Sequence, residues 1–254
     1  MIAGIDLQYE GAMARIVIDL PPLNVLTNDA LTALNGSFVT AAAHKDVRLI
    51  RLEACGKFFS AGVDVGDHVG DKVQTMMHRL LELFETLDRI EQPTIGLVHG
   101  TALGGGCELI AALDLCYAAE GARFGQPEIN LGLFAPPASV LLPRLIGERR
   151  ALEMLLTGAP ISATVAADWG LINAAYPADE LVAKVDAVCE QLLKMSGVAL
   201  RQAKRAVQLS RDESIAEAHR TVYEQYLNEL MKSEDAHEGL ASFLEKRPPN
   251  WQHR

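Results

Sequence analysis

The residues most able to do chemistry in this sequence surround a run of three glycines. Gly104–Gly106 follow an apolar stretch, TIGLVHG, and Glu108 lies two residues further on, in a run typical of a buried helix, CELIAAL. The plain interpretation is a tight turn between a strand and a helix. The alternative is an oxyanion or anion site, because a helix start directs free N–H groups and a positive dipole end toward a ligand. Neither the Walker motif nor the spacing G-x-G-x-x-G is present, so a phosphate loop is not indicated.

A second glycine turn and a second carboxylate extend this pattern. Ala61 and Gly62, in FFSAGVDVGD, could offer another backbone N–H, so that one donor from each of two loops would hold a thioester oxygen. Glu128, in FGQPEINLG, follows Pro127, which is also an ordinary way to begin a helix. Two acids beside one anion site would form a general acid/base pair. Spacing alone does not establish that they meet, and a carboxylate favoured by a helix start is the alternative for each.

The elements that must position these residues follow from the periodicity of the apolar residues. Short β-type runs predict a hairpin over 4–10 and 14–20 and further strands over 47–54, 94–100, 114–120, 122–126 and 172–177. Helical spacing predicts helices over 28–43, 72–90, 107–113, 148–157 and 162–168, with three more over 178–246. The pattern predicts an α/β core over residues 1–176 and a helical C-terminal region over 177–254.

The composition narrows the possible functions. Hydrophobic residues make up 49% of the 254 residues and charged residues 22%, which is typical of a globular protein. The net charge of −10 argues against a nucleic-acid binder. The N-terminus has no basic leader pattern and no run approaches ~18 apolar residues, so we expect no membrane segment and a cytoplasmic protein. The cysteines and histidines show no metal-ligand spacing, so we expect free thiols and no metal site.

Three motifs, taken in order, resemble the enoyl-CoA hydratase/isomerase (crotonase) superfamily: FFSAGVDV, HGTALGGGCEL and ARFGQPEINLGL. The similarity continues through LTGAPISATVAADWGLINAAYP and the terminal FLEKRPPNW. The resemblance implies an α/β fold built as a spiral of repeated ββα turns, with a C-terminal helical region that builds a homotrimer or homohexamer. It also implies an acyl-CoA thioester substrate, with coenzyme A entering as part of that substrate and no separate cofactor.

The resemblance also assigns roles to individual residues. Ala61 and Gly105 would donate the two oxyanion N–H groups, and Glu108 would activate water while Glu128 donates a proton. The alternative is that the two acids share both tasks through one water. The residues expected to line the substrate and CoA channel are Lys57, Ala61, Gly62, Val63, Asp64, Gly104 and Phe134. Lys246 and Arg247 are candidates to serve the site of a neighbouring subunit, although a solvated helix end explains them equally well. Isomerases of the superfamily often lack one acid, so the presence of both favours hydration.

One segment departs from the common hydratases. Residues 131–145, LGLFAPPASVLLPRL, stand where those enzymes carry a glycine-rich P-G-x-G-G-T segment. Phe134, Pro136 and Pro137 would replace flexible glycines with a bulky ring and a stiff turn, through drift of a loop or through reshaping of an acyl pocket. The segment is most similar to hydratases of cyclohexa-1,5-diene-1-carbonyl-CoA, which act in anaerobic benzoyl-CoA degradation. The alternatives are a short-chain enoyl-CoA hydratase, an isomerase, and a non-catalytic RNA-binding member, which the negative charge disfavours.

Overall fold

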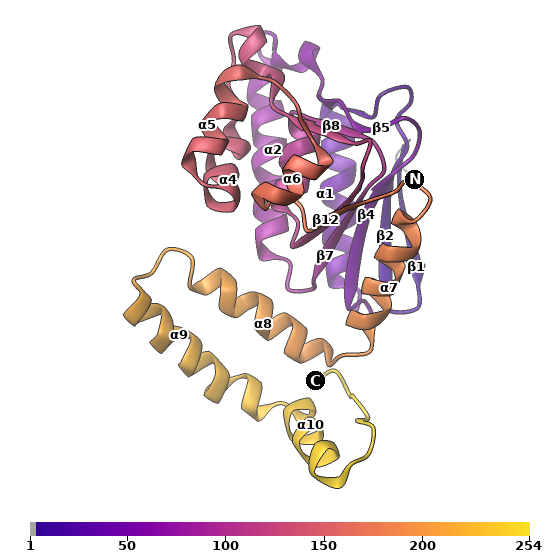
Figure 1. Cartoon of the computed structure of the whole chain (residues 1–254), viewed down its shortest axis with the longest axis vertical. Helices are drawn as coiled ribbons and strands as arrows, with labels where there is room; N and C mark the ends of the chain where they lie inside the picture. The colour runs from indigo at the N-terminus through magenta and orange to yellow at the C-terminus, as the bar shows by residue number, and fades with distance from the viewer. Residues whose placement is uncertain (1–3) are drawn as a thin grey trace. The chain divides into compact units, whose positions relative to one another are not determined.

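The computed structural model describes residues 4–254, which form two compact units (Figure 1). The first unit contains the chain up to Ile90 together with Thr94–Asp186. The second unit contains Glu91–Pro93 and Ala187–Arg254. The predicted boundary at residues 176 and 177 falls inside the first unit.

The first unit is built on a six-stranded sheet with the order β1-β2-β4-β7-β9-β12. The predicted hairpin forms its edge, with β1 (Ile5–Glu10) antiparallel to β2 (Met13–Ile18). All the following neighbours are parallel, and these strands are β4 (Leu49–Ala54), β7 (Thr94–Val98), β9 (Leu115–Ala119) and β12 (Ala174–Tyr176). The strand β7 is buried along its whole length, as expected for the middle of a covered parallel sheet.

Short strands and helices alternate with these long strands. A four-stranded sheet has the order β11-β10-β8-β5, and β3 (Val25–Leu26) pairs with β6 (Gly62–Val63). The four short strands are β5 (Phe58–Ser60), β8 (Thr101–Leu103), β10 (Arg123–Gly125) and β11 (Ile161–Ser162). The chain therefore repeats one turn: β4, β5 and α2 (Lys72–Arg89), then β7, β8 and α3 (Gly105–Ala112). This repetition confirms the predicted spiral of ββα turns.

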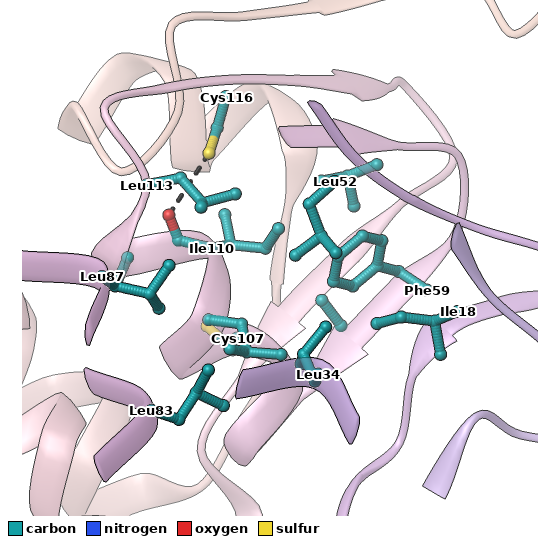
Figure 2. Packing of buried hydrophobic residues seen from close by; sticks show 14 of the residues in the cluster. Ile18, Leu34, Leu52, Phe59, Leu83, Leu87, Cys107, Ile110, Leu113 and Cys116 are labelled. Carbon is teal, nitrogen blue, oxygen red and sulfur yellow. Dashed lines mark hydrogen bonds between the residues drawn. The ribbon is translucent and has the colours of Figure 1, made fainter. Parts of the chain in front are cut away.

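The core lies between the sheet and the helices that follow its strands, and Figure 2 shows its centre. The helix α1 (Asn28–Ala43) begins where Thr27 caps it, and its Leu34 reaches the same cluster as Phe59 and Leu83. The remaining helices of this unit are α4 (Pro136–Ile146), α5 (Glu148–Thr157), α6 (Ala163–Trp169) and the start of α7 (Leu181–Leu193). Two cysteines pack into the core, and burial raises the pKa of the Cys116 thiol to about 12. These thiols are packing residues that do not ionise near neutral pH.

The segment that departs from the common hydratases is a helix, so the expected stiff turn at Pro136 and Pro137 was wrong. These prolines occupy the first two positions of α4, where their missing N–H groups leave no hydrogen bond unmade. A further proline, Pro143, lies inside the same helix. The sequence pattern hid the helix because three prolines in eleven residues normally argue against one.

The second unit is helical. Besides the end of α7 it contains α8 (Gly197–Leu209), α9 (Ile215–Asn228) and α10 (Glu234–Glu245), with a short 3₁₀ turn at Leu230–Lys232. The predicted three helices over 178–246 are therefore four among the described residues. The last of these helices begins after residues 229–233, where the Ser233 side chain caps α10.

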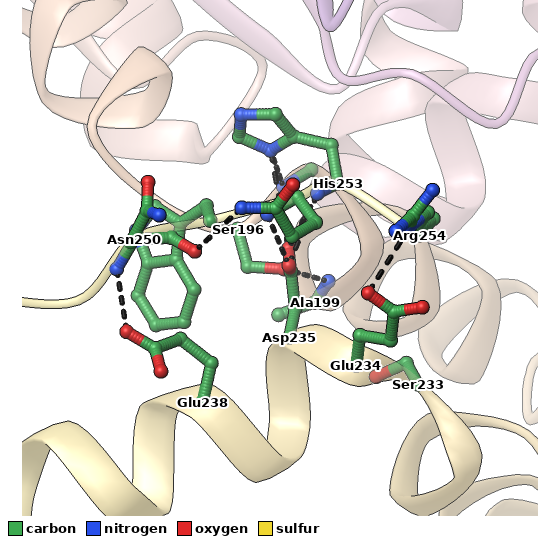
Figure 3. Close-up of polar contacts among 12 residues, drawn as sticks. Ser196, Ala199, Ser233, Glu234, Asp235, Glu238, Asn250, His253 and Arg254 are labelled. Carbon is green, nitrogen blue, oxygen red and sulfur yellow. Dashed lines mark hydrogen bonds and ion pairs between the residues drawn. The ribbon is translucent and has the colours of Figure 1, made fainter.

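The C-terminal residues of this unit are fixed by one buried carboxylate (Figure 3). Asp235, at the start of α10, is 2% exposed and accepts a hydrogen bond of 2.5 Å from the Ser196 hydroxyl. It also accepts backbone N–H bonds from Gln252 at 2.7 Å and from His253 at 3.0 Å. Because Ser196 is the N-cap of α8, this carboxylate ties two helix starts and the end of the chain together.

None of the helices within residues 4–254 combines the length and the apolar character needed to cross a bilayer.

Candidate active site

The sequence-predicted residues meet at a pocket of about 90 Å³ in the first unit. Its walls come from the two glycine turns, from the first turns of α3 and α4, from α2 and from two 3₁₀ turns, η1 (Val65–His68) and η2 (Pro127–Leu131). The lining residues are Ala61, Gly62, Val63, Val65, His68, Met76, Met77, Leu80, Gly104, Gly105, Glu108, Pro127, Glu128, Leu131, Leu133, Phe134, Ala135 and Pro136. The pocket is mostly apolar and contains two carboxyl groups, as a site for a small acyl group requires.

Glu108 is the more deeply buried of the two acids, with 2% of its surface exposed. It lies in the first turn of α3, and its Oε1 accepts a hydrogen bond of 2.9 Å from the N–H of Ala138. Ala138 is the third residue of α4, after two prolines that have no N–H to offer. The helix start thus presents Glu108 with a donor, while burial outweighs this bond and raises the pKa of Glu108 to about 8.

Glu128 approaches the same pocket from η2 and is partly buried. Burial raises the pKa of Glu128, while the hydrogen bond to its own backbone and the nearby His68 lower it. The negative charge of Glu128 in turn raises the pKa of Glu108. The structure therefore brings together the two acids that sequence spacing could not place, and it couples their titrations.

Gly104 makes this arrangement possible. It has a positive φ of 49°, and a Cβ at this position would overlap the carboxylate of Glu128. Next to it, Gly105 begins α3, and a Cβ there would lie 2.7 Å from Cγ2 of Val63. Glycine is needed at both places because the turn is pressed between the acid and the strand β6.

The two turns also supply backbone donors, although not the predicted pair. The N–H of Ala61 donates to the carbonyl oxygen of Leu23 at 2.9 Å, so it is not available to a substrate and the expectation for Ala61 was wrong. In the parallel pair β3–β6, Asp64 donates to Leu26, and the N–H of Val63 therefore points away from β3. A Cβ built on Gly105 would lie 3.4 Å from the backbone nitrogen of Val63, so the two turns are in close contact here.

Gly105 itself carries a free donor. As the first residue of α3, its N–H has no acceptor within the helix, and it makes no other hydrogen bond among the described residues. The N–H groups of Val63 and Gly105 thus lie on adjacent turns at one wall of the pocket. Regular alternation would direct the N–H groups of residues 61 and 63 to the same side, and Gly62, with φ 100°, breaks it between them, so the sequence held no signal that favoured Val63 over Ala61.

The remaining predicted residues are more scattered. Gly62 lines the pocket, and Phe134 stands at its edge with 69% of its surface exposed. Asp64 lies outside this pocket, in a neighbouring depression with Leu23 and Thr27, and Lys57 is exposed in the turn before β5. The sequence analysis missed His68 and the α2 residues that face the pocket, because nothing in their spacing links them to the glycine turns.

The two basic residues near the C-terminus belong to the second unit. Lys246 ends α10 in a left-handed conformation with φ 55°. Arg247 forms ion pairs with Glu238 at 2.5 Å and with Glu245 at 2.7 Å, and these carboxylates raise the pKa of its guanidinium. The charge of Arg247 is thus already balanced within its own unit.

Within residues 4–254, no group of three or more histidine, cysteine, aspartate or glutamate side chains is arranged to hold a metal ion.

Comparison with known proteins agrees with this geometry. Residues 8–254 match the family described as enoyl-CoA hydratase/isomerase. The chain is 35% identical over 248 residues to a cyclohexa-1,5-dienecarbonyl-CoA hydratase of Thauera aromatica, covering 98% of this chain and 96% of the relative. It is 36% identical to a probable enoyl-CoA hydratase of Mycobacterium bovis, covering 89% of this chain and 91% of the relative.

A solved structure shows the same fold. An enoyl-CoA hydratase subunit I of Geobacillus kaustophilus superposes with a TM-score of 0.93 at 32% identity, covering 100% of this chain and 99% of that one. The resemblance and the crotonase-like fold predicted from the sequence are both confirmed. The chain therefore belongs to the enoyl-CoA hydratase/isomerase family and is an enzyme of the hydratase type, a carbon–oxygen lyase acting on acyl-CoA.

Proposed function

We propose that this enzyme adds water across the α,β double bond of a small unsaturated acyl-CoA, with Glu108 and Glu128 as the acid/base pair. The observation that carries the proposal is the pocket that both carboxyl groups line together with Gly105, whose N–H is free. A thioester carbonyl placed against Gly105 and Val63 would present its α and β carbons to the two acids. An isomerisation needs only one base that moves a proton, so the pair of acids favours hydration.

Hydration of the double bond uses one proton transfer at each acid. Glu108 accepts a proton from water as the oxygen forms a bond to the β carbon, and the electron pair of the double bond moves to give an enolate. The N–H groups of Val63 and Gly105 stabilise the charge on the thioester oxygen. Glu128 then delivers its proton to the α carbon. The product is a hydroxyacyl-CoA, and a transfer of one proton from Glu108 to Glu128 restores the starting state.

The pair must hold one proton in total for this cycle. In the empty pocket, burial keeps that proton on Glu108 at neutral pH, since its pKa is raised to about 8. Glu108 can act as the base only after the proton has passed to Glu128. A water that bridges the two carboxyl groups would provide the path for this transfer.

The preferred substrate that we propose is cyclohexa-1,5-diene-1-carbonyl-CoA, in the anaerobic breakdown of aromatic acyl-CoA. Two observations support it: the name of the Thauera aromatica relative, and a pocket of about 90 Å³ whose walls are methionine, leucine and the Phe134 ring at its edge. Coenzyme A would enter only as part of the substrate, with Lys57 and Asp64 near its path, and no other cofactor is required.

We also propose that the enzyme is a cytoplasmic homotrimer or homohexamer. In the second unit Tyr226 is 52% exposed and Phe243 is 83% exposed, whereas Val222 and Leu230 are partly buried. The neighbouring Leu244 is 79% exposed. Large apolar side chains exposed together on one set of helices favour contact with another chain.

The substrate test is a direct comparison of two thioesters. Purified enzyme is assayed with cyclohexa-1,5-diene-1-carbonyl-CoA and with crotonyl-CoA by the change in the absorbance of the conjugated system. We expect kcat/KM for the cyclic substrate to be greater by ~10²-fold or more, because filling one methylene of an apolar pocket already gives ~10–200-fold. Equal rates, or a preference for crotonyl-CoA, would rule out the cyclic assignment and leave a general short-chain hydratase.

A further inference from the structure

The pocket contains a third ionisable side chain, His68, to which the reaction above gives no task. His68 ends the turn η1, is partly buried and lines the pocket together with Glu108 and Glu128. Its Nδ1 lies 3.0 Å from the carbonyl oxygen of Asp64, one turn earlier in the chain. The contact holds the ring in one orientation at the wall of the pocket.

This contact also defines the state of the ring. A carbonyl oxygen only accepts hydrogen bonds, so Nδ1 must carry a hydrogen and donate it. The second nitrogen, Nε2, makes no hydrogen bond to any residue of the described chain. In the neutral ring Nε2 is an acceptor, and in the imidazolium form it is a second donor with a positive charge.

Two of the elements that line the pocket with His68 bring carboxyl groups, Glu108 from α3 and Glu128 from η2. The residues of α2 that line it are the uncharged Met76, Met77 and Leu80. The imidazole is therefore the single basic side chain among the residues that line this pocket.

Two aspartates precede His68 on its own turn, Asp64 and Asp67. The carboxylate of Asp67 accepts the backbone N–H of Asn28 at 2.9 Å. A Cβ at Gly66 would lie 2.8 Å from Oδ1 of Asp64, so that carboxylate packs against the turn itself. Of the acids that line the pocket with it, Glu128 is the one whose pKa His68 lowers.

Glu128 is the acid that has one oxygen without a partner. Its Oε2 is buried and makes no hydrogen bond, whereas Glu108 is held by the N–H of Ala138. A buried carboxylate oxygen without a donor costs free energy unless a positive charge or a proton compensates it. We propose that His68 is a positioning residue that, as an imidazolium, stabilises the ionised form of Glu128 and so sets the proton balance of the acid pair.

The electrostatics of the pocket support this role. Burial raises the pKa of Glu128, and the nearby His68 lowers it. No comparable positive group acts on Glu108, whose pKa burial raises to about 8. His68 therefore separates the two acids: it favours the negative charge on Glu128 and the proton on Glu108. This inference rests on the proposed acid/base pair, and it adds a residue that controls where the shared proton lies.

Two substitutions separate the charge of His68 from its structural hydrogen bond. His68→Asn places an amide N–H where Nδ1 was, so it can keep the bond to Asp64 while it removes the charge. His68→Gln places an amide near the position of Nε2, again without charge. The matched control is His78→Asn, an exposed histidine on α2 that does not line the pocket. If one His68 variant fails to fold, the test uses the titration of the other variant.

The first measurement does not depend on turnover. The infrared band of protonated carboxyl groups is followed against pH in the substrate-free protein, and Glu128→Gln identifies the contribution of Glu128. An opposite charge within ~4–6 Å lowers the pKa of an acid by ~1–3 units, so we expect both His68 variants to shift the Glu128 titration upward by ~1 pH unit. The titration of the His78→Asn control should match that of the wild type.

The second measurement is the pH profile of kcat/KM on the acyl-CoA substrate. Its acid limb reports the lower of the two titrations of the pair, so it should move upward by a similar amount in both variants. An unshifted Glu128 titration in either folded variant overturns the role of His68, whatever the activity. Absence of acyl-CoA turnover in the wild type overturns the proposed function instead, and the infrared titration still decides the effect of His68.

Discussion

Replacing Glu108 by glutamine should change how the stability of the protein depends on pH. The wild-type carboxyl group is buried in the apolar pocket, and its pKa is raised from 4.5 to about 8. In the unfolded chain the same group titrates at its ordinary value. Between these two pH values the folded protein therefore holds a proton that the unfolded chain has released. Glutamine keeps the size and the acceptor for the Ala138 N–H but does not titrate.

The sign of the effect follows from this proton. Stabilisation by the neutral Glu108 is complete at pH values below the ordinary pKa and is lost as the pH rises through the folded value of about 8. One pKa unit corresponds to about 1.4 kcal/mol, so the wild-type free energy of unfolding should fall relative to that of Glu108→Gln by about that much for each pH unit in this window. Above the window the difference should become constant.

Urea unfolding at fixed protein concentration, at several pH values from 5 to 9, measures this difference. Fixed concentration matters because association adds to the apparent stability. Glu120→Gln, a change at an exposed carboxylate, is the control and should run parallel to the wild type. Parallel curves for the wild type and Glu108→Gln would show that Glu108 is ionised in the folded protein at neutral pH, and the shared-proton argument would fail.

Other perturbations have equally definite outcomes. Val63→Pro and Gly105→Pro each remove one proposed oxyanion donor and should lower kcat by ~10²–10³-fold; normal turnover by a variant with an unchanged circular dichroism spectrum would count against that donor. Phe134→Ala should lower kcat/KM for the cyclic thioester more than for crotonyl-CoA. An equal loss on both substrates would show that Phe134 does not determine substrate specificity. Asp235→Ala should destabilise the second unit by about 1–3 kcal/mol and speed proteolysis of its C-terminus. A urea unfolding curve identical to that of the wild type would contradict this. Analytical ultracentrifugation should show the trimer or hexamer that the family resemblance implies, and a monomer at micromolar concentration would refute this.

Much of the spiral could be predicted because its strands and helices carry regular apolar patterns. The helix over 28–43 was predicted with its exact bounds, since its cap and its buried face are both local features of the sequence. The helix α4 was not predicted, because its prolines act as helix breakers in any local rule. Its position is explained only by the structure, in which two of them occupy the first turn.

The site was predictable as a set of residues but not as an arrangement. The motifs identified Gly105, Glu108 and Glu128, and the structure places all three at one pocket. The donor on the second turn was misplaced by two residues, because the direction of an N–H depends on the pairing of β6 with β3, which short strands do not reveal in sequence. His68 was missed since its approach to Glu128 depends on how η1 folds against the pocket, a contact between separate parts of the chain.

The most direct test of the central claim follows the fate of water. The enzyme is incubated with cyclohexa-1,5-diene-1-carbonyl-CoA, and in parallel with crotonyl-CoA, in water labelled with oxygen-18, and the CoA products are analysed by mass spectrometry. We predict a hydroxyacyl-CoA that has gained one labelled water, with the label absent when Glu108 or Glu128 is replaced by glutamine. A product with unchanged mass and a displaced double bond, or no change in either thioester, would contradict the assignment of this pocket as the site of a hydratase.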